Sequence, residues 1–202
     1  MSFKSRIKHY SNRILSGYGY HIDHLHNGFS IIQNLNWLGK YDIKTVFDIG
    51  ANEGQFVKFI KGCLPNAKIF SFEPLPDCFL KLKQLSLTIN NMEPMNYAIG
   101  EEDGTIEMNV NEFSPSSSIL EMKERHLHSF PFANKSQKTS ISVRNLDSLY
   151  KELNFEKNLM VKIDVQGYEG KVLEGGKEFF RNIPNLVIVE TSIIQLYEGE
   201  PS

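Results

Sequence analysis

The chain has 202 residues, of which 41% are hydrophobic and 23% are charged, and its formal net charge is −2 at pH 7. Such a length and composition are ordinary for a soluble globular domain, and the weak negative charge excludes a general attraction to nucleic acid. No apolar run approaches the length of a membrane span, and no signal-peptide stretch follows the basic start. Cys63 and Cys78 lack metal-ligand spacing, and we expect both to be small buried thiols. The sequence therefore predicts a cytoplasmic protein without a membrane span.

Residues 1–40 are expected to form an N-terminal helical segment, ahead of a main domain at residues 41–202. The first part of this segment, Phe3–Leu15, is basic and has a helical pattern. The favoured interpretation is a solvated helix packed on its own domain. The alternative is a basic amphipathic helix that lies on a membrane surface or on a partner.

In the main domain, the expected strands and helices alternate, as is typical of a parallel sheet with helices on both faces. The expected elements, in chain order, are strand 45–49, helix 54–62, strand 68–73, helix 77–87, strand 94–99, strand 104–110, strand 141–144, helix 148–153, strand 159–165, a helix that ends at Phe180, and strand 186–190. We expect Asp147 to cap the helix 148–153 at its N-terminus. Residues 111–138 show no clear period, and loops of this length are usually functional lids or mobile segments.

A glycine turn, Asp48–Gly54, follows the first expected strand and opens a helix. Such a turn lets a ligand approach the backbone closely and directs N–H groups of the helix start at it. The spacing of Gly50 and Gly54 does not fit G-x-G-x-x-G, which disfavours NAD and FAD. No Gly-Lys-Ser/Thr follows, which disfavours ATP. An acidic residue two positions before Gly50 suits a cofactor with a cationic amino end, such as S-adenosylmethionine.

The second expected strand ends in Glu73, at the interval where a β-α-β unit delivers a carboxylate to ribose hydroxyls. Its two oxygens can accept from both hydroxyls of a ribose. The alternative is that Glu73 merely caps a turn before Pro74 and Pro76. Because the glycine turn lies upstream, we favour the ribose role.

Taken together, these motifs resemble the FkbM family of S-adenosylmethionine-dependent methyltransferases over roughly residues 30 to 200. The segments that carry the resemblance are Asp48–Gly54, Phe72–Pro74, Ser116–Ser118, Asn145–Asp147, Lys162–Glu169 and Val189–Glu190 with Leu196–Gly199. The resemblance implies the Rossmann-like α/β sheet of class I methyltransferases and O-methylation of a sugar or small-molecule hydroxyl. The expected partner is thus a small-molecule or glycan acceptor.

The resemblance also implies roles for individual residues. Around the methionine part of S-adenosylmethionine it places Asp48, Gly50, Ala51, Asn52 and Gly54. Glu73 and Pro74 are expected at the ribose, Ala98 and Ile99 at the adenine, and Ser117 and Ser118 over the cofactor carboxylate. The alternative for these serines is a flexible polar loop.

Asp164 and Glu169 are the candidate catalytic residues, as the base for the acceptor hydroxyl or as groups that orient it. The open alternative is that Asp164 binds turn amides and Glu169 favours the start of the next helix. Together with Glu190 they offer oxygen ligands to Mg²⁺, but no Asp-Asp/Asn pair follows Asp164, and we expect no metal.

Class I methyltransferases usually continue past the fifth strand, whereas this chain ends at Ser202. We therefore expect a sheet truncated after the fifth core strand, with self-association into a homo-oligomer through an uncovered edge. The rival hypothesis is a catalytically incomplete module of the same fold that binds the cofactor or serves in assembly.

Overall fold

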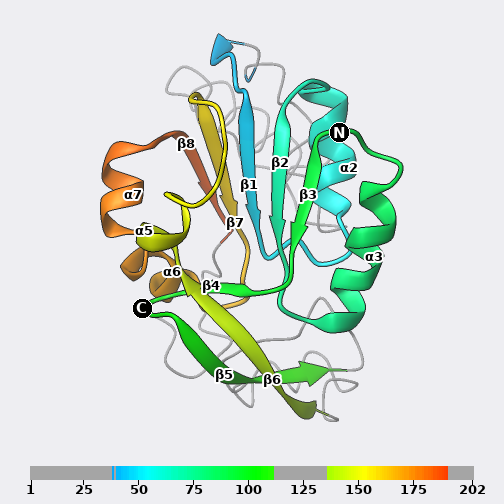
Figure 1. Cartoon of the computed structure of the whole chain (residues 1–202), viewed down its shortest axis with the longest axis vertical. Coiled ribbons are helices and arrows are strands. Elements are labelled where there is room, and N and C mark those ends of the chain that lie inside the picture. Colours follow the sequence, from blue (N-terminus) through cyan, green and yellow to red (C-terminus); the bar gives the residue numbers. More distant parts are fainter. Residues whose placement is uncertain (1–37, 39, 112–135, 191–202) are drawn as a thin grey trace, which may run out of the picture. The chain divides into compact units, whose positions relative to one another are not determined.

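Figure 1 shows a computed structural model of the chain, which describes residue 38, residues 40–111 and residues 136–190. The chain divides into two compact units, Met1–Lys40 and Tyr41–Ser202. Only the second is described in detail. The helical segment predicted at residues 1–40 and the serines at 117 and 118 lie outside the described residues, apart from 38 and 40, and their roles stay predictions.

A parallel five-stranded sheet with strand order β3-β2-β1-β7-β8 forms the centre of the second unit (Figure 1). Its strands are β1 (Thr45–Ile49), β2 (Lys68–Phe72), β3 (Met92–Met95), β7 (Leu159–Ile163) and β8 (Pro184–Val189). The helices are α2 (Gln55–Cys63), α3 (Pro76–Ser86), α5 (Leu146–Leu149), α6 (Glu169–Glu174) and α7 (Lys177–Asn182). Along the chain, helices separate the strands of this central parallel sheet, so the predicted Rossmann-like α/β fold is confirmed.

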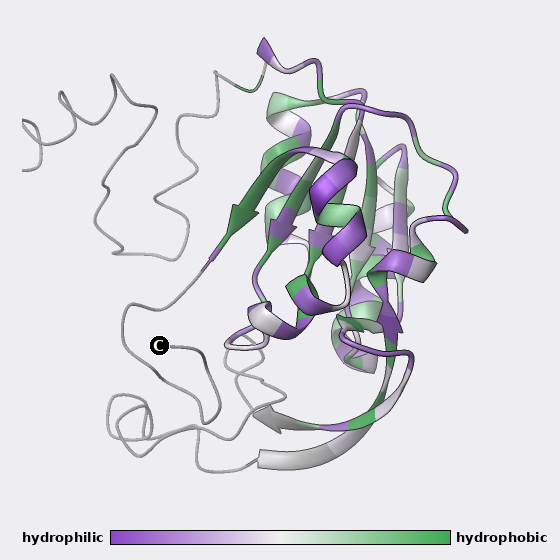
Figure 2. Cartoon of the chain, turned by 90° about the vertical axis from the view of Figure 1, so that its left-hand side faces the viewer, coloured by the Kyte–Doolittle hydropathy of each residue, from purple (hydrophilic) through white to green (hydrophobic). Residues whose placement is uncertain are grey.

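The central strands are buried on both faces, because helices cover a parallel sheet on either side. All five residues of β1 are buried, as are all five of β7. Figure 2 shows the resulting hydrophobic (green) segments along the strands of the sheet. This explains why these strands are largely apolar rather than alternating in pattern.

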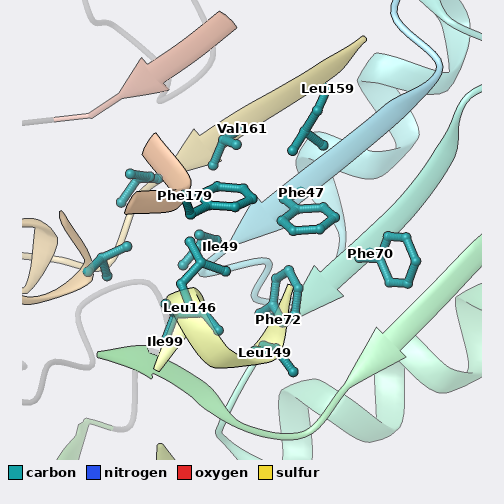
Figure 3. Close-up of a cluster of buried hydrophobic side chains, with 12 residues drawn as sticks. Phe47, Ile49, Phe70, Phe72, Ile99, Leu146, Leu149, Leu159, Val161 and Phe179 are labelled. Carbon is teal, nitrogen blue, oxygen red and sulfur yellow. The ribbon is translucent and has the colours of Figure 1, made fainter. Parts of the chain in front are cut away.

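Phe47 lies at the centre of the larger hydrophobic cluster (Figure 3). Its ring meets Phe70 edge-on at 5.3 Å between centroids and stacks on Phe179 of α7 at 5.7 Å. Leu146 and Leu149 of α5 belong to the same cluster. Aromatic pairs of this kind add about 0.5–1.5 kcal/mol each beyond the burial of area. The cluster thus fixes helices α5 and α7 on one face of the sheet.

A second sheet lies beyond the carboxyl ends of the central strands, with order β4-β6-β5 (Figure 1). It consists of β4 (Ala98–Gly100), β5 (Gly104–Asn111) and β6 (Ser136–Asn145). Strands β5 and β6 pair antiparallel, whereas β4 and β6 are parallel. A separate apolar cluster that includes Leu75 and Met108 packs against this sheet.

The predicted strand 94–99 is wrong, because the chain leaves the central sheet at Asn96 and begins β4 at Ala98. The side-chain amide of Asn96 donates to the carbonyl oxygens of Glu73 and Pro74, at 3.0 Å each. These bonds hold the turn between β3 and β4 against the end of β2.

The predicted helix 148–153 and its cap are also wrong. Helix α5 spans Leu146–Leu149, and Asn145 caps it by accepting from the Ser148 N–H at 3.2 Å. Asp147 instead accepts from the N–H groups of Glu178 and Phe179, at 3.1 and 2.7 Å, and so caps the first turn of α7. A sequence pattern does not show whether an acidic residue caps the helix that it adjoins or a neighbouring helix.

The single helix predicted to end at Phe180 is broken into α6 and α7 at Gly175–Gly176. A Cβ at Gly175 would lie 1.8 Å from the carbonyl oxygen of Gly100 in β4, so the backbones meet too closely for a side chain. This contact ties α6 to the second sheet.

The prediction of two buried thiols holds for Cys78 but is wrong for Cys63, which is exposed. Helix α2 ends at Cys63, and the next residue, Leu64, enters the core in its place. Within the ranges that the structure describes, no helix is long and apolar enough to cross a bilayer.

Candidate active site

Three sequence-predicted segments meet at the carboxyl edge of the central sheet. The glycine turn follows β1, Glu73 follows β2, and Asp164 follows β7. Because β1 pairs in register with both neighbours, Ile49 lies opposite Phe72 on one side and opposite Ile163 on the other. The turn therefore sits between Glu73 and Asp164, at the edge where open α/β sheets bind ligands.

Gly50 is required by a positive φ of 78° and by a close approach of the backbone. A Cβ at this position would lie 1.9 Å from the carbonyl oxygen of Asp164. On the other side, the N–H groups of Gly50 and Ala51 both donate to the carbonyl of Phe72 at 3.1 Å. The turn is thus held between β2 and β7.

Gly54 also has a positive φ, and it precedes helix α2. Its missing Cβ makes room for α3, because a Cβ would lie 2.5 Å from Leu85 Cδ2. Within the turn, the N–H groups of Asn52 and Gly54 are bonded to Glu73 and to the Ala51 carbonyl. Gly54 has no side chain that could accept from the first N–H groups of α2. These N–H groups are therefore better placed than those of the turn to donate to an acceptor atom of a ligand.

Glu73 connects the end of β2 to the glycine turn. Its Oε2 accepts from the Asn52 N–H at 2.8 Å, and its Oε1 accepts from the Leu75 N–H at 2.9 Å. The residue is only 6% exposed. Glu73 therefore does cap the turn before Pro76, and each oxygen keeps a further lone pair for a ligand hydroxyl.

Burial raises the pKa of Glu73 to about 7, against the partial stabilisation of its charged form by the two N–H donors. The raised pKa predicts a pH-dependent stability. Protonated Glu73 stabilises the folded protein fully below pH 4.5. This stabilisation declines as the pH rises toward 7 and is lost above pH 7. The loss amounts to about 3 kcal/mol.

We expect Glu73→Gln to remove this dependence. The free energy of unfolding is measured by urea unfolding near pH 5 and near pH 8. Its fall between the two pH values should be about 2.5 kcal/mol smaller in the variant than in the parent. Glu93→Gln is the matched control, because the Glu93 carboxylate is exposed and pairs with Lys68. Parallel pH profiles of the parent and Glu73→Gln would contradict the raised pKa.

Lys162 is a site residue that the sequence reasoning missed. It lies in β7 directly opposite Asp48 of β1, and the two residues are 8% and 0% exposed. The ammonium is 3.3 Å from Asp48 Oδ1 and 3.3 Å from Asp164 Oδ2, and it donates to the Gly50 carbonyl at 3.1 Å. The sequence does contain a sign of this pair. Strands β1 and β7 are otherwise largely apolar, and each carries one charged residue at its fourth position, with opposite signs.

The two candidate catalytic carboxylates differ in their surroundings. The Asp164 side chain is 26% exposed, and its Oδ1 accepts from the Gln166 amide at 2.9 Å. Glu169 turns back instead, and its Oε1 accepts from the N–H groups of Val165 and Gly167 at 3.1 and 3.2 Å. Burial raises the pKa of Glu169 against these donors. Asp164 is thus better placed to meet an acceptor, and Glu169 shapes the loop between β7 and α6.

Comparison with known proteins decides the family. Residues 48–202 match the family described as the methyltransferase FkbM domain, which is most of the chain. The chain belongs to the FkbM methyltransferase family. Its predicted membership is thereby confirmed.

Curated relatives of this FkbM domain include two methyltransferases. The 2-O-methyltransferase NoeI of Sinorhizobium fredii is 28% identical over 162 residues, which cover 77% of this chain and 66% of NoeI. The hexuronic acid methyltransferase AglP of Haloferax volcanii is 28% identical over 148 residues, which cover 72% of this chain and 54% of AglP. The chain thus spans less than two thirds of the length of either relative.

A solved structure is also similar to this FkbM domain. The crystal structure of methyltransferase FkbM from Methylobacillus flagellatus KT has 16% sequence identity and a TM-score of 0.48. The similarity covers 72% of this chain and 32% of that one.

The remaining cofactor roles in the FkbM domain stay predictions. Asp48 is buried beneath the turn, where it pairs with Lys162 rather than facing solvent. Ile99 is 1% exposed inside the larger cluster and Ala98 packs in the smaller one, so their burial does not favour contact with adenine. Pro74 accepts from Asn96 through its carbonyl. Among the described residues, no three His, Cys, Asp or Glu side chains are grouped to hold a metal ion.

Proposed function

We propose that this chain transfers a methyl group from S-adenosylmethionine to a hydroxyl oxygen of a sugar or small molecule. Its family membership supports methyl transfer. The names of two relatives support the acceptor class, because one is a 2-O-methyltransferase and the other a hexuronic acid methyltransferase.

The observation that carries the proposal is the position of Glu73. A buried carboxylate lies at the carboxyl end of β2 and is bonded to the Asn52 N–H of the glycine turn. Ribose hydroxyls would donate to the remaining lone pairs of Glu73. The amino-acid part of the cofactor would then lie along the turn, with its carboxylate at the start of α2.

The chemistry asks mainly for alignment of the two reactants. When bound, S-adenosylmethionine supplies an activated methyl group, which the acceptor oxygen takes as the carbon–sulfur bond breaks. Asp164 is the group that would accept the hydroxyl proton, because its carboxylate is fixed by Lys162 and Gln166 and is still partly exposed. Glu169 would hold the adjoining loop in place through its bonds to Val165 and Gly167.

Calorimetric titration tests the proposal. S-adenosylmethionine and S-adenosylhomocysteine should bind, and NAD should not. Glu73→Gln should weaken both affinities by about 10–100-fold, because glutamine keeps one acceptor oxygen and so loses one of the two hydrogen bonds to a charged group, worth about 1.5–3 kcal/mol. Glu93→Gln, on the neighbouring strand β3, should bind as the parent does.

Other outcomes of the titration would contradict the proposal. If neither S-adenosyl compound binds the parent, the proposed function fails for this chain. If both bind Glu73→Gln as tightly as the parent, the ribose role of Glu73 fails. Binding without methyl transfer to any of a panel of sugars would support the catalytically incomplete module instead.

A further inference from the structure

Lys162 lies where three segments of the candidate site meet. Its ammonium donates to the Gly50 carbonyl at 3.1 Å and lies 3.3 Å from both Asp48 Oδ1 and Asp164 Oδ2. It also lies 5.7 Å from the centre of the Phe56 ring in α2. One cation therefore contacts the end of β1, the glycine turn and the segment after β7.

The ammonium remains charged despite its burial. Burial alone would lower the pKa of Lys162, but attraction to Asp48 and Asp164 outweighs this effect and raises it. Asp48 is fully buried, and within the described part of the chain neither of its oxygens accepts a hydrogen bond. Burial raises the pKa of Asp48, and the attraction of the neighbouring Lys162 ammonium offsets this effect only in part.

The segments that Lys162 contacts also meet each other directly. The Asp164 N–H donates to the Ile49 carbonyl at 3.1 Å, and the Asp164 carbonyl occupies the space that a Cβ of Gly50 would need. The carboxylate of Asp164 is held from two sides, by Lys162 at Oδ2 and by Gln166 at Oδ1. A shift of the Lys162 head group would thus remove one contact from the turn and one from the carboxylate.

We propose that Lys162 is a positioning residue, whose ammonium fastens the glycine turn to the Asp164 carboxylate, with Asp48 as its buried counter-ion. The meaning of this arrangement for catalysis rests on the proposed function, because it joins the cofactor turn to the group that takes the acceptor proton.

Amide hydrogen exchange of the ligand-free protein tests this role without any activity assay. Asp48→Val/Lys162→Met removes both buried charges together, so that no unpaired charge is left in the interior. We expect exchange at Gly50, Ala51 and Asp164 to become at least about tenfold faster, while exchange in the core strand β2 stays within about twofold of the parent.

Parental exchange at all three amides in the folded double variant would overturn the proposal, because Lys162 would then serve only to neutralise Asp48. If the double variant does not fold, Lys162→Arg replaces it. Arginine keeps a cation beside Asp48 but cannot reproduce the contacts of a compact ammonium, and the same acceleration is expected.

Titration with S-adenosylhomocysteine is run in parallel. If the parent does not bind it, the proposed function fails, whereas the exchange result still decides the role of Lys162.

Discussion

Lys162→Met should lower the free energy of unfolding by about 3–5 kcal/mol, the usual cost of removing one partner from a buried ion pair. The variant leaves the Asp48 carboxylate fully buried without its cation and also leaves the Gly50 carbonyl without its donor. Methionine has nearly the same length as lysine, so the loss of charge rather than of packing dominates. Urea unfolding near neutral pH measures the effect.

Lys68→Met is the matched control. Lys68 also lies in a strand of the central sheet and pairs with Glu93 at 2.9 Å, but both side chains are partly exposed to solvent, at 36% and 46%. Exposed pairs contribute at most about 1 kcal/mol, so this variant should remain close to the parent. Equal losses in the two lysine variants would show that the ion pair between Asp48 and Lys162 is not a buried one.

Gly50→Ala should prevent the native turn from forming. The new Cβ would lie 1.9 Å from the Asp164 carbonyl oxygen and 2.9 Å from its carbon, and both are backbone atoms. Asp164 has little freedom to retreat, because its N–H is bonded to Ile49. The positive φ alone costs about 1–2 kcal/mol, and the clash adds to it. We expect a loss of at least about 4 kcal/mol, or no folded protein.

Gly62→Ala provides the control for Gly50→Ala. Gly62 lies inside helix α2, and a Cβ there would meet no atom within 4 Å. Alanine favours a helix over glycine by about 0.5–1 kcal/mol, so the thermal midpoint of this variant should rise. A Gly50→Ala protein as stable as the parent would show that the Asp164 backbone, after β7, lies farther from the turn.

The sequence predicts strands β1, β2, β7 and β8 of the central sheet because each is a largely apolar run. Tertiary contacts decide the features that it misses. Asn96 turns the chain out of the sheet by binding the carbonyls of Glu73 and Pro74, and Gly175 divides a helix because it meets Gly100. Asp147 caps α7 from a distant position in the chain. None of these partners lies within a local window of sequence.

The candidate site likewise combines residues that the sequence predicts with one, Lys162, that it does not. The glycine turn, Glu73 and Asp164 are predictable because each ends a strand of one parallel sheet, and parallel strands end at a common edge. The role of Lys162 depends on its register with Asp48, which no single strand reveals. Two opposite charges in otherwise apolar strands, each at the fourth position of its strand, are nevertheless a pattern that indicates such a pair.

A crystal structure of the complex with S-adenosylhomocysteine tests the central claim most directly, namely that the glycine turn and Glu73 hold the cofactor. We predict that both ribose hydroxyls donate to Glu73, that the amino-acid part lies along Gly50–Gly54, and that Asp164 faces the sulfur. A complex in which the ribose lies away from Glu73, or in which the ligand occupies another edge of the sheet, would contradict the account.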